Sequence, residues 1–240
     1  ESAGERFLGL WVTANGEPVV VAPALYREDI ETGMAVKIRV ASYPDGEDWA
    51  RLLPCEGVRS DSPLIAVDED LSARHCLHLL TAIPHVRLVG AERIMQQLRG
   101  VKSPDELHAM ERSAAVADAV YEEVLPLLSP GVTERDLQKI ILDRFAAAGA
   151  ETAWAIVAFG PNASRPHHVS GETKLEDGMV VVLDLGGSVS GYQSDITRTV
   201  AVGHAVPEAE SIYAVVYAAH MAALEAARPG IRCQDVDRAA

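Results

Sequence analysis

The stretch that decides the fold reads VVVLDLGGSVSGYQSDITRTV, residues 180–200. Two apolar runs flank a segment rich in Gly and Ser, and this pattern predicts a β-hairpin. If the turn is centred on Val189 and Ser190, Asp184 and Asp195 fall directly opposite each other, with Cβ atoms about 5 Å apart. The apolar neighbours on both sides of Asp184 also predict a strand that is buried on both faces.

Two facing carboxylates destabilise a hairpin unless something compensates for their charge. The spacing leaves three interpretations open: a divalent metal ion bound by the carboxylate oxygens, a pair that shares one proton, or a structural pair. In the structural interpretation, one Asp faces solvent in a slipped register, or Arg198 neutralises both. Because two aspartates are too few ligands for a di-metal centre, we expect further donors beyond residue 240.

A second segment that could carry chemistry reads FGPNASRPHH, residues 159–168. It follows a predicted strand at 154–159 and is rich in turn-forming residues, which predicts a loop. Functional side chains are common on loops that a rigid scaffold holds. His167 is therefore a candidate to donate a hydrogen bond to a substrate carbonyl or to a developing oxyanion. The alternative is that His167 and His168 are a solvated pair on the surface.

The rest of the chain predicts two domains and an α+β fold class. Residues 1–98 alternate short apolar runs with helical patterns, which predicts a small α/β domain. The run Ser103-Pro104-Asp105-Glu106 predicts a helix start with a capping box, and Thr133 is expected to cap the next helix. A further long helix is expected at about 207–227. We place the second domain at 103–240.

One pattern occurs twice. Ser129-Pro130-Gly131 and Arg228-Pro229-Gly230 each end a predicted long helix, and Pro130 and Pro229 stand 99 residues apart. Coincidence is one explanation, because Pro-Gly after a helix is common. The other is an internal repeat, whose second copy should go on to strands of its own. On that interpretation we expect the chain to stop at Ala240 inside the second copy.

Composition narrows the classes of function. With 48% hydrophobic and 23% charged residues, the chain has the balance of a globular protein. The net charge of −14 argues against nucleic acid and anionic membrane surfaces as partners. No stretch approaches the roughly 18 apolar residues of a membrane span. The three cysteines are widely separated, which favours a reducing compartment, and we expect a cytoplasmic protein.

The two segments resemble the pita-bread metallopeptidases, which include Xaa-Pro dipeptidases (prolidases), Xaa-Pro aminopeptidases and methionine aminopeptidases. The likeness to the proline-specific branch rests on the Asp-x10-Asp pair that ends in the run 194–199, SDITRT, and on the run 159–163, FGPNA, followed by Pro166 and His167. It covers about residues 5–240. The fold that it implies is a small α/β domain followed by an antiparallel sheet covered by helices.

The resemblance implies two divalent metal ions, with Mn²⁺ as the first expectation and Co²⁺ or Zn²⁺ as alternatives. It makes Asp184 a ligand of one ion, Asp195 a bridge between both, and His167 the catalytic histidine that binds the substrate. The family's other ligands are one His and two Glu, which come later in its fold and which these 240 residues do not contain. The family fold also consists of two related halves, in agreement with the repeat.

The leading functional prediction is therefore metal-dependent hydrolysis of the Xaa-Pro bond in dipeptides. The expected partners are a small peptide with Pro at its second position and a second copy of the chain in a homodimer. An Xaa-Pro aminopeptidase that acts on longer peptides is the near alternative. A creatinase-like enzyme without metal ions and a catalytically inactive relative are the others. Creatinase-like members lack the metal carboxylates, so Asp184 and Asp195 count against that branch.

Overall fold

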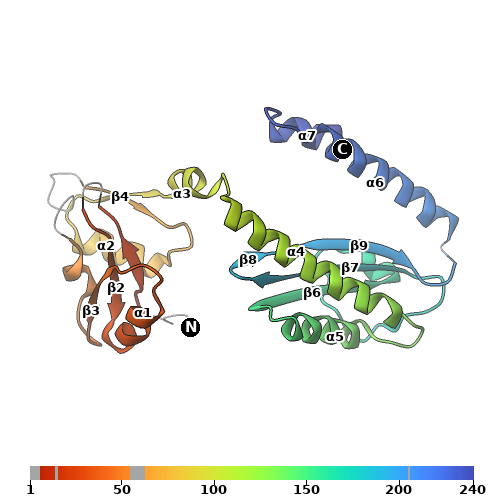
Figure 1. The fold of residues 1–240 in the computed structure, drawn as a ribbon, viewed down its shortest axis with the longest axis horizontal. Helices are drawn as coiled ribbons and strands as arrows, with labels where there is room; N and C mark the ends of the chain where they lie inside the picture. Colours follow the sequence, from red (N-terminus) through yellow and green to blue (C-terminus); the bar gives the residue numbers. More distant parts are fainter. Residues whose placement is uncertain (1–5, 14–15, 55–62, 205) are drawn as a thin grey trace. The chain divides into compact units, whose positions relative to one another are not determined.

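The computed structural model describes residues 6–13, 16–54, 63–204 and 206–240. The chain divides into two compact units, Glu1–Val101 and Lys102–Ala240, and the colours of Figure 1 run from red to yellow in the first and on to blue in the second. Each unit has its own cluster of buried apolar side chains. The two units are therefore described one after the other.

The first unit contains two small sheets. In one, β1 (Gly9–Trp11) pairs antiparallel with β2 (Val19–Pro23), which pairs parallel with β3 (Arg39–Tyr43). In the other, β4 (Leu64–Val67) and β5 (Arg87–Gly90) are parallel. Helical segments lie between the strands, in the order η1 (Ala24–Tyr26), α1 (Arg27–Gly33), η2 (Trp49–Leu52) and α2 (Ala73–Ala82), and α3 (Glu92–Arg99) follows the last strand. The alternation of strands and helices that the sequence predicts is present in this unit.

The second unit contains one antiparallel sheet with helices before and after it. Its central strand β7 pairs with β6 on one side and with β8 and β9 on the other. The elements run in the order α4 (Pro104–Val124), η3 (Leu125–Leu127), α5 (Glu134–Ala147), β6 (Thr152–Phe159), η4 (Gly160–Ser164), β7 (Val180–Val189), β8 (Tyr192–Gln193), β9 (Ile196–Ala201), α6 (Pro207–Ala226) and α7 (Cys233–Ala239).

Both predicted helix caps are confirmed. The Ser103 Oγ accepts a hydrogen bond from the Glu106 N–H at 3.3 Å, and the Glu106 carboxylate accepts one from the Ser103 N–H at 2.7 Å. The Thr133 Oγ1 accepts from the Asp136 N–H at 3.1 Å. These caps fix where α4 and α5 begin, because they satisfy backbone N–H groups that the first helical turn leaves unpaired.

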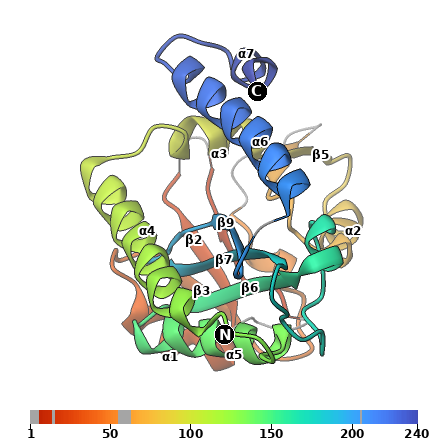
Figure 2. The same cartoon turned by 90° about the vertical axis from the view of Figure 1, so that its right-hand side faces the viewer.

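The two capped helices cover one face of the sheet (Figure 2). Val181, Leu183 and Leu185 of β7 are fully buried in a cluster with apolar side chains of α4 and α5. Successive strand residues point to opposite faces, and Val182 and Asp184 on the other face are only half-buried. The prediction of a strand buried on both faces was therefore wrong, since the helices that supply the core contact one face alone.

The repeated Pro-Gly pattern has the same local structure in both places. Gly131 has φ +97° and Gly230 has φ +89°, and each follows a long helix and precedes a second one. This left-handed conformation favours glycine. The agreement supports the internal repeat, although the two helix pairs differ in burial: α4 buries five side chains, whereas no residue of α6 or α7 is buried.

Candidate active site

The hairpin that carries the two aspartates is present, but its register differs from the prediction. The turn lies at Ser190 and Gly191, with φ +54° and +76°, rather than at Val189 and Ser190. Two-residue hairpin turns with positive φ at both positions strongly favour Gly at the second, and a β-branched Val resists positive φ. Asp184 therefore pairs with Thr197 instead of Asp195.

The register places the two aspartates diagonally on the hairpin. A diagonal pair of this kind lies roughly 7–8 Å apart, compared with about 5 Å for residues directly opposite. Asp184 is half-buried, and its Oδ1 accepts a hydrogen bond from the Thr197 hydroxyl at 2.6 Å. Asp195 is exposed. Two carboxylates that share one proton must lie closer together than this. The wider separation therefore favours the interpretation in which their oxygens bind a cation between them.

Asp195 follows an irregular point in the hairpin. The side chain of Ser194 is buried and bonds both the N–H and the carbonyl oxygen of Gly187, at 3.3 and 3.1 Å. A Cβ on Gly186 would collide with the Ser194 carbonyl oxygen, so this close approach requires glycine. After β8 ends at Gln193, regular strand structure begins again only at Ile196, the first residue of β9. Interruptions of this kind redirect side chains and are common beside active sites.

Arg198 does not neutralise the aspartates. Its guanidinium lies 3.5 Å from the carboxylate of Asp118 on α4 and 5.8 Å from the ring centroid of Tyr121. Arg198 pairs with Leu183 and so belongs to the face of the sheet that the helices cover, whereas Asp184 belongs to the other. This excludes one of the two structural explanations for the aspartate pair. The other, in which one Asp faces solvent in a shifted register, agrees with the pairing of Asp184 and the exposure of Asp195.

His167 lies on the predicted loop, which leaves the end of β6. Phe159 pairs with Val181, and Asp184 is three residues further along β7, or about 10 Å at 3.3 Å per residue. The side chain of His167 is exposed. Within the described residues, no hydrogen bond joins His167 to either aspartate. The loop that carries His167 follows β6, and β6 pairs with β7, which carries Asp184.

The loop is anchored by a residue that the sequence analysis did not single out. Glu134, the first residue of α5, is 0% exposed, and its carboxylate accepts four hydrogen bonds. Its Oε1 accepts from the Phe159 N–H and the Asn162 side-chain amide, both at 2.9 Å. Its Oε2 accepts from the His168 Nε2 at 2.8 Å and the Gly171 N–H at 2.9 Å. His168 is thus part of a buried network and not one of a solvated pair.

The surroundings of Glu134 favour its ionised form. Burial raises the pKa of Glu134, but hydrogen bonds from His168, Phe159, Asn162 and Gly171 outweigh it, so the pKa lies below its usual value. The carboxylate also belongs to the first turn of α5, where the helix dipole stabilises negative charge. Acidic residues are ordinary in a first helical turn, so the sequence gives no signal that separates this buried carboxylate from an exposed one.

The lowered pKa predicts a pH dependence of stability. A group whose pKa is lower in the folded protein contributes stability above its unfolded pKa, about 4.3 for Glu, and loses that stability as pH falls through the folded pKa. We expect the free energy of unfolding to fall below about pH 5, and to fall less steeply in the Glu134→Gln variant. Urea unfolding of both proteins at a series of acidic pH values measures this. Equal slopes in the two proteins would contradict the assignment.

The described residues do not form a complete metal site. Across 6–13, 16–54, 63–204 and 206–240, no group of three or more His, Cys, Asp or Glu side chains is arranged to hold a metal ion. Asp184 and Asp195 are oxygen donors of the kind that Mn²⁺ accepts. They fit the role of two ligands within a larger set, and they do not form a complete site by themselves.

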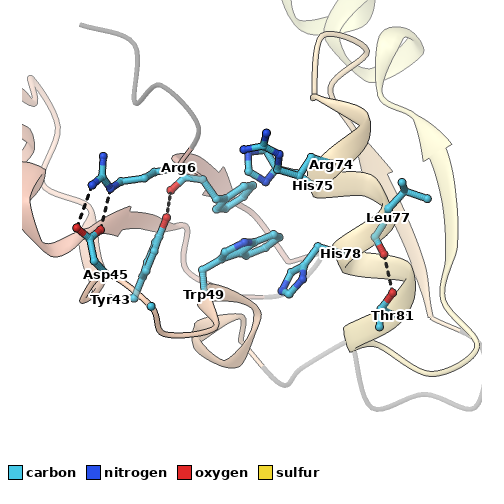
Figure 3. A pocket seen from close by; sticks show the side chains of 11 residues that line it. Arg6, Tyr43, Asp45, Trp49, Arg74, His75, Leu77, His78 and Thr81 are labelled. Atoms are coloured by element: carbon cyan, nitrogen blue, oxygen red, sulfur yellow. Dashed lines mark hydrogen bonds and ion pairs between the residues drawn. The ribbon is translucent and has the colours of Figure 1, made fainter.

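The first unit has a hollow of about 510 Å³ that contains none of the predicted site residues (Figure 3). The rings of Phe7 and Trp49 stack there with centroids 3.8 Å apart, and His75 meets both rings edge-on. His78 lies beside Trp49, with its Nε2 2.7 Å from the Asp48 carboxylate. The hollow is the open side of a packed aromatic cluster, and we do not assign the active site to it.

Comparisons with known proteins identify the family. The model of metallopeptidase family M24 matches residues 108–240, which include the hairpin and the His167 loop. The chain belongs to metallopeptidase family M24. The resemblance to the pita-bread metallopeptidases and the α+β fold class are thereby confirmed.

The similar proteins are peptidases. The probable dipeptidase PepE of Mycobacterium tuberculosis is 34% identical over 241 residues, which cover 98% of this M24 chain and 64% of that protein. A dipeptidase from Pyrococcus horikoshii has a TM-score of 0.89 and 30% identity, over 99% of this chain and 66% of that one. A prolidase from Thermococcus sibiricus has a TM-score of 0.87 and 27% identity, over 98% and 65%.

The M24 chain spans 64% of the length of the first curated relatives that it matches. In the part that the structure describes, the helices are too short or too polar to cross a bilayer.

Proposed function

We propose that this M24 protein is a metal-dependent dipeptidase that hydrolyses Xaa-Pro bonds. The observation that carries the proposal is the hairpin on which Asp184 and Asp195 stand diagonally, on or beside the sheet face that the helices leave uncovered. Membership of a metallopeptidase family supports a metal-binding role for these carboxylates. Similarity to a dipeptidase and to a prolidase supports a short substrate with Pro at its second position.

In this proposal Asp184 and Asp195 hold divalent metal ions, with Mn²⁺ as the first expectation and Co²⁺ or Zn²⁺ as alternatives. The described residues supply these two donors, and the family resemblance implies one His and two Glu besides. When bound, such ions polarise a carbonyl group and lower the pKa of water. The Thr197 hydroxyl fixes one oxygen of Asp184 through their 2.6 Å hydrogen bond. That hydrogen bond would orient the carboxylate toward its ligand, as partners of metal ligands commonly do.

His167 is the proposed substrate-binding residue. An imidazole N–H can donate a hydrogen bond to the scissile carbonyl oxygen, and the bond strengthens as negative charge develops on that oxygen. The exposed side chain of His167 on a firmly anchored loop suits contact with a small substrate. The same proposal includes four wider assignments. These are a creatinase-like N-terminal domain at 1–98, a catalytic domain at 103–240, a cytoplasmic location and a homodimer.

The test compares peptide substrates on the protein in its full encoded length, loaded with Mn²⁺. An Xaa-Pro dipeptide should be hydrolysed, whereas the matched dipeptide with Ala in place of Pro and the matched Xaa-Pro-Xaa tripeptide should be poor substrates. Hydrolysis of the tripeptide with the dipeptide untouched would identify an Xaa-Pro aminopeptidase instead. No release of product from any of the three peptides would contradict a proline-specific peptidase.

The His167→Ala variant should lose catalysis without losing its fold. Removing one donor to a developing oxyanion costs about 10²–10³-fold in kcat. KM should change much less, because the hydrogen bond is strongest in the transition state. Steady-state kinetics with the Xaa-Pro dipeptide measure both constants, and an unchanged kcat would rule out this role for His167. The exposed position of the side chain makes a loss of stability beyond about 0.5 kcal/mol unexpected.

A further inference from the structure

Glu134 is a buried, ionised carboxylate to which the proposed mechanism gives no chemical role. All four of its hydrogen-bond donors come from the loop 159–171, which carries His167. Burying a charge is costly unless donors compensate for it. A fully buried carboxylate therefore calls for an explanation, and the distribution of its contacts along the loop offers one.

The four donors are spread over the whole loop. Phe159 stands where the loop leaves β6, Asn162 lies in its first turn, and His168 and Gly171 lie at its far end. The two oxygens divide these contacts, because Oε1 binds the outgoing half and Oε2 binds the returning half. One rigid planar group thus ties the two ends of the loop together, with His167 immediately before one of the fastened residues.

Other contacts fasten the loop to the scaffold. The Ser170 hydroxyl accepts from the Val157 N–H at 2.9 Å and donates to the Val157 carbonyl oxygen at 3.1 Å, so the returning segment follows the free edge of β6. The Arg135 N–H donates to the Gly171 carbonyl oxygen at 3.0 Å. These bonds contact only the far end of the loop. Glu134 joins that end to both Phe159 and Asn162. The Asn162 side chain also donates to the Thr173 hydroxyl, just beyond the loop, at 3.0 Å.

We propose that Glu134 is a positioning residue, which fixes the loop 159–171 and thereby the place of His167 relative to the substrate. The proposal rests on the proposed function, because it takes His167 as the substrate-binding residue. Glu134 itself is fully buried and acts only through the loop. Misplacement of a catalytic group by about 1 Å can cost on the order of 10²-fold in rate, so a support of this kind has a measurable kinetic effect.

The carboxylate form is essential to this role. A Gln at position 134 has nearly the same volume but offers one carbonyl oxygen and one NH₂ group. If its oxygen replaces Oε1, its NH₂ group faces the donors His168 and Gly171, of which the backbone N–H of Gly171 cannot change its polarity. Glu134→Gln therefore keeps the packing but removes the direct tie between the two ends of the loop, while the bonds of Ser170 and Arg135 remain. Glu172→Gln is the matched control, because Glu172 is an exposed carboxylate that pairs with Arg135.

A double-mutant cycle separates positioning from a general loss of structure. The variants are Glu134→Gln, His167→Ala and the two combined, each in the full encoded length and loaded with Mn²⁺, with kcat expressed per folded, metal-loaded molecule. Glu134→Gln should lower kcat for the Xaa-Pro dipeptide about 10- to 100-fold with little change in KM. In the His167→Ala background the same change should cost less than about twofold, since Glu134 acts through His167. Equal losses in both backgrounds, or none in either, would overturn the proposal.

Amide hydrogen exchange tests the loop without any substrate. Glu134→Gln should speed the exchange of the Gly171 N–H at least about tenfold, while a core amide such as that of Leu183 and all amides in Glu172→Gln stay unchanged. Asn162→Ala is a milder second variant that removes one donor and should speed loop exchange to a smaller extent. Unchanged loop exchange in Glu134→Gln would overturn the proposal even if the dipeptide is cleaved. A fully active His167→Ala variant would instead overturn the role of His167, and with it the kinetic half of the proposal.

Discussion

Replacing Asp195 by Asn should abolish nearly all hydrolysis of Xaa-Pro dipeptides. Asn keeps the size of the side chain and one acceptor oxygen, but it lacks the negative charge and the second anionic oxygen that a bridging ligand needs. Metal ions supply several kcal/mol of transition-state stabilisation, and 1.36 kcal/mol corresponds to a factor of ten. We therefore expect kcat/KM to fall at least about 10³-fold. Steady-state kinetics and elemental analysis of the same preparation measure the activity and the bound metal together.

The matched control for this variant is Asp118→Asn. It makes the same change of charge at an exposed carboxylate of α4, which pairs with Arg198 on the helix-covered side of the sheet. Metal content and kcat/KM should both stay close to those of the unmodified protein. An Asp195→Asn variant with full metal content and full activity would show that Asp195 is not a metal ligand.

Replacing Glu134 by Ala should cause the largest loss of stability of the substitutions considered. Four donors would lose their acceptor inside the protein, and two of them are backbone N–H groups of Phe159 and Gly171 that cannot turn away. A buried donor without a partner costs about 1–3 kcal/mol. Water that enters the cavity replaces some of the lost bonds, so the loss should be smaller than the sum over the four donors. We expect the free energy of unfolding to fall by about 3 kcal/mol or more.

Urea unfolding measures this loss, with Glu172→Ala as the control. Glu172 is exposed, and its ion pair with Arg135 lies at the surface, so its removal should change stability by no more than about 0.5 kcal/mol. A loss below about 1 kcal/mol for Glu134→Ala would mean that the buried network contributes little, and that the loop keeps its structure without the carboxylate.

The elements of this fold could largely be predicted from the sequence because their signals are local. Ser103 and Thr133 are caps whose hydrogen bonds reach only three residues ahead, and both predictions are confirmed. In the second unit, β6 is mainly apolar and β7 begins with an apolar run, whereas β9 contains Thr197, Arg198 and Thr199. The sequence analysis did not predict α1, which has only seven residues, fewer than a pattern of helical period needs.

The hairpin and the loop that carry Asp184, Asp195 and His167 could be predicted, but their geometry could not, and the roles of the three residues stay predictions. The spacing of Asp184 and Asp195 identifies the hairpin, yet the register depends on which two residues adopt positive φ, and placing the turn at Ser190 and Gly191 shifts the pairing by two. Glu134 could not be predicted as a buried residue for another reason. Its four donors lie 25 to 37 residues away in sequence, and only the folded chain brings them together.

The proposed function is tested most directly by the dependence of Xaa-Pro dipeptide hydrolysis on metal, in the protein of full encoded length. The protein is stripped with a chelator, assayed, and assayed again after Mn²⁺, Co²⁺ or Zn²⁺ is returned. We expect hydrolysis to disappear with the metal and to return with it, and we expect the Asp195→Asn variant not to recover. Hydrolysis that persists at full rate after the metal has been removed would contradict the assignment of a metallopeptidase site to Asp184 and Asp195.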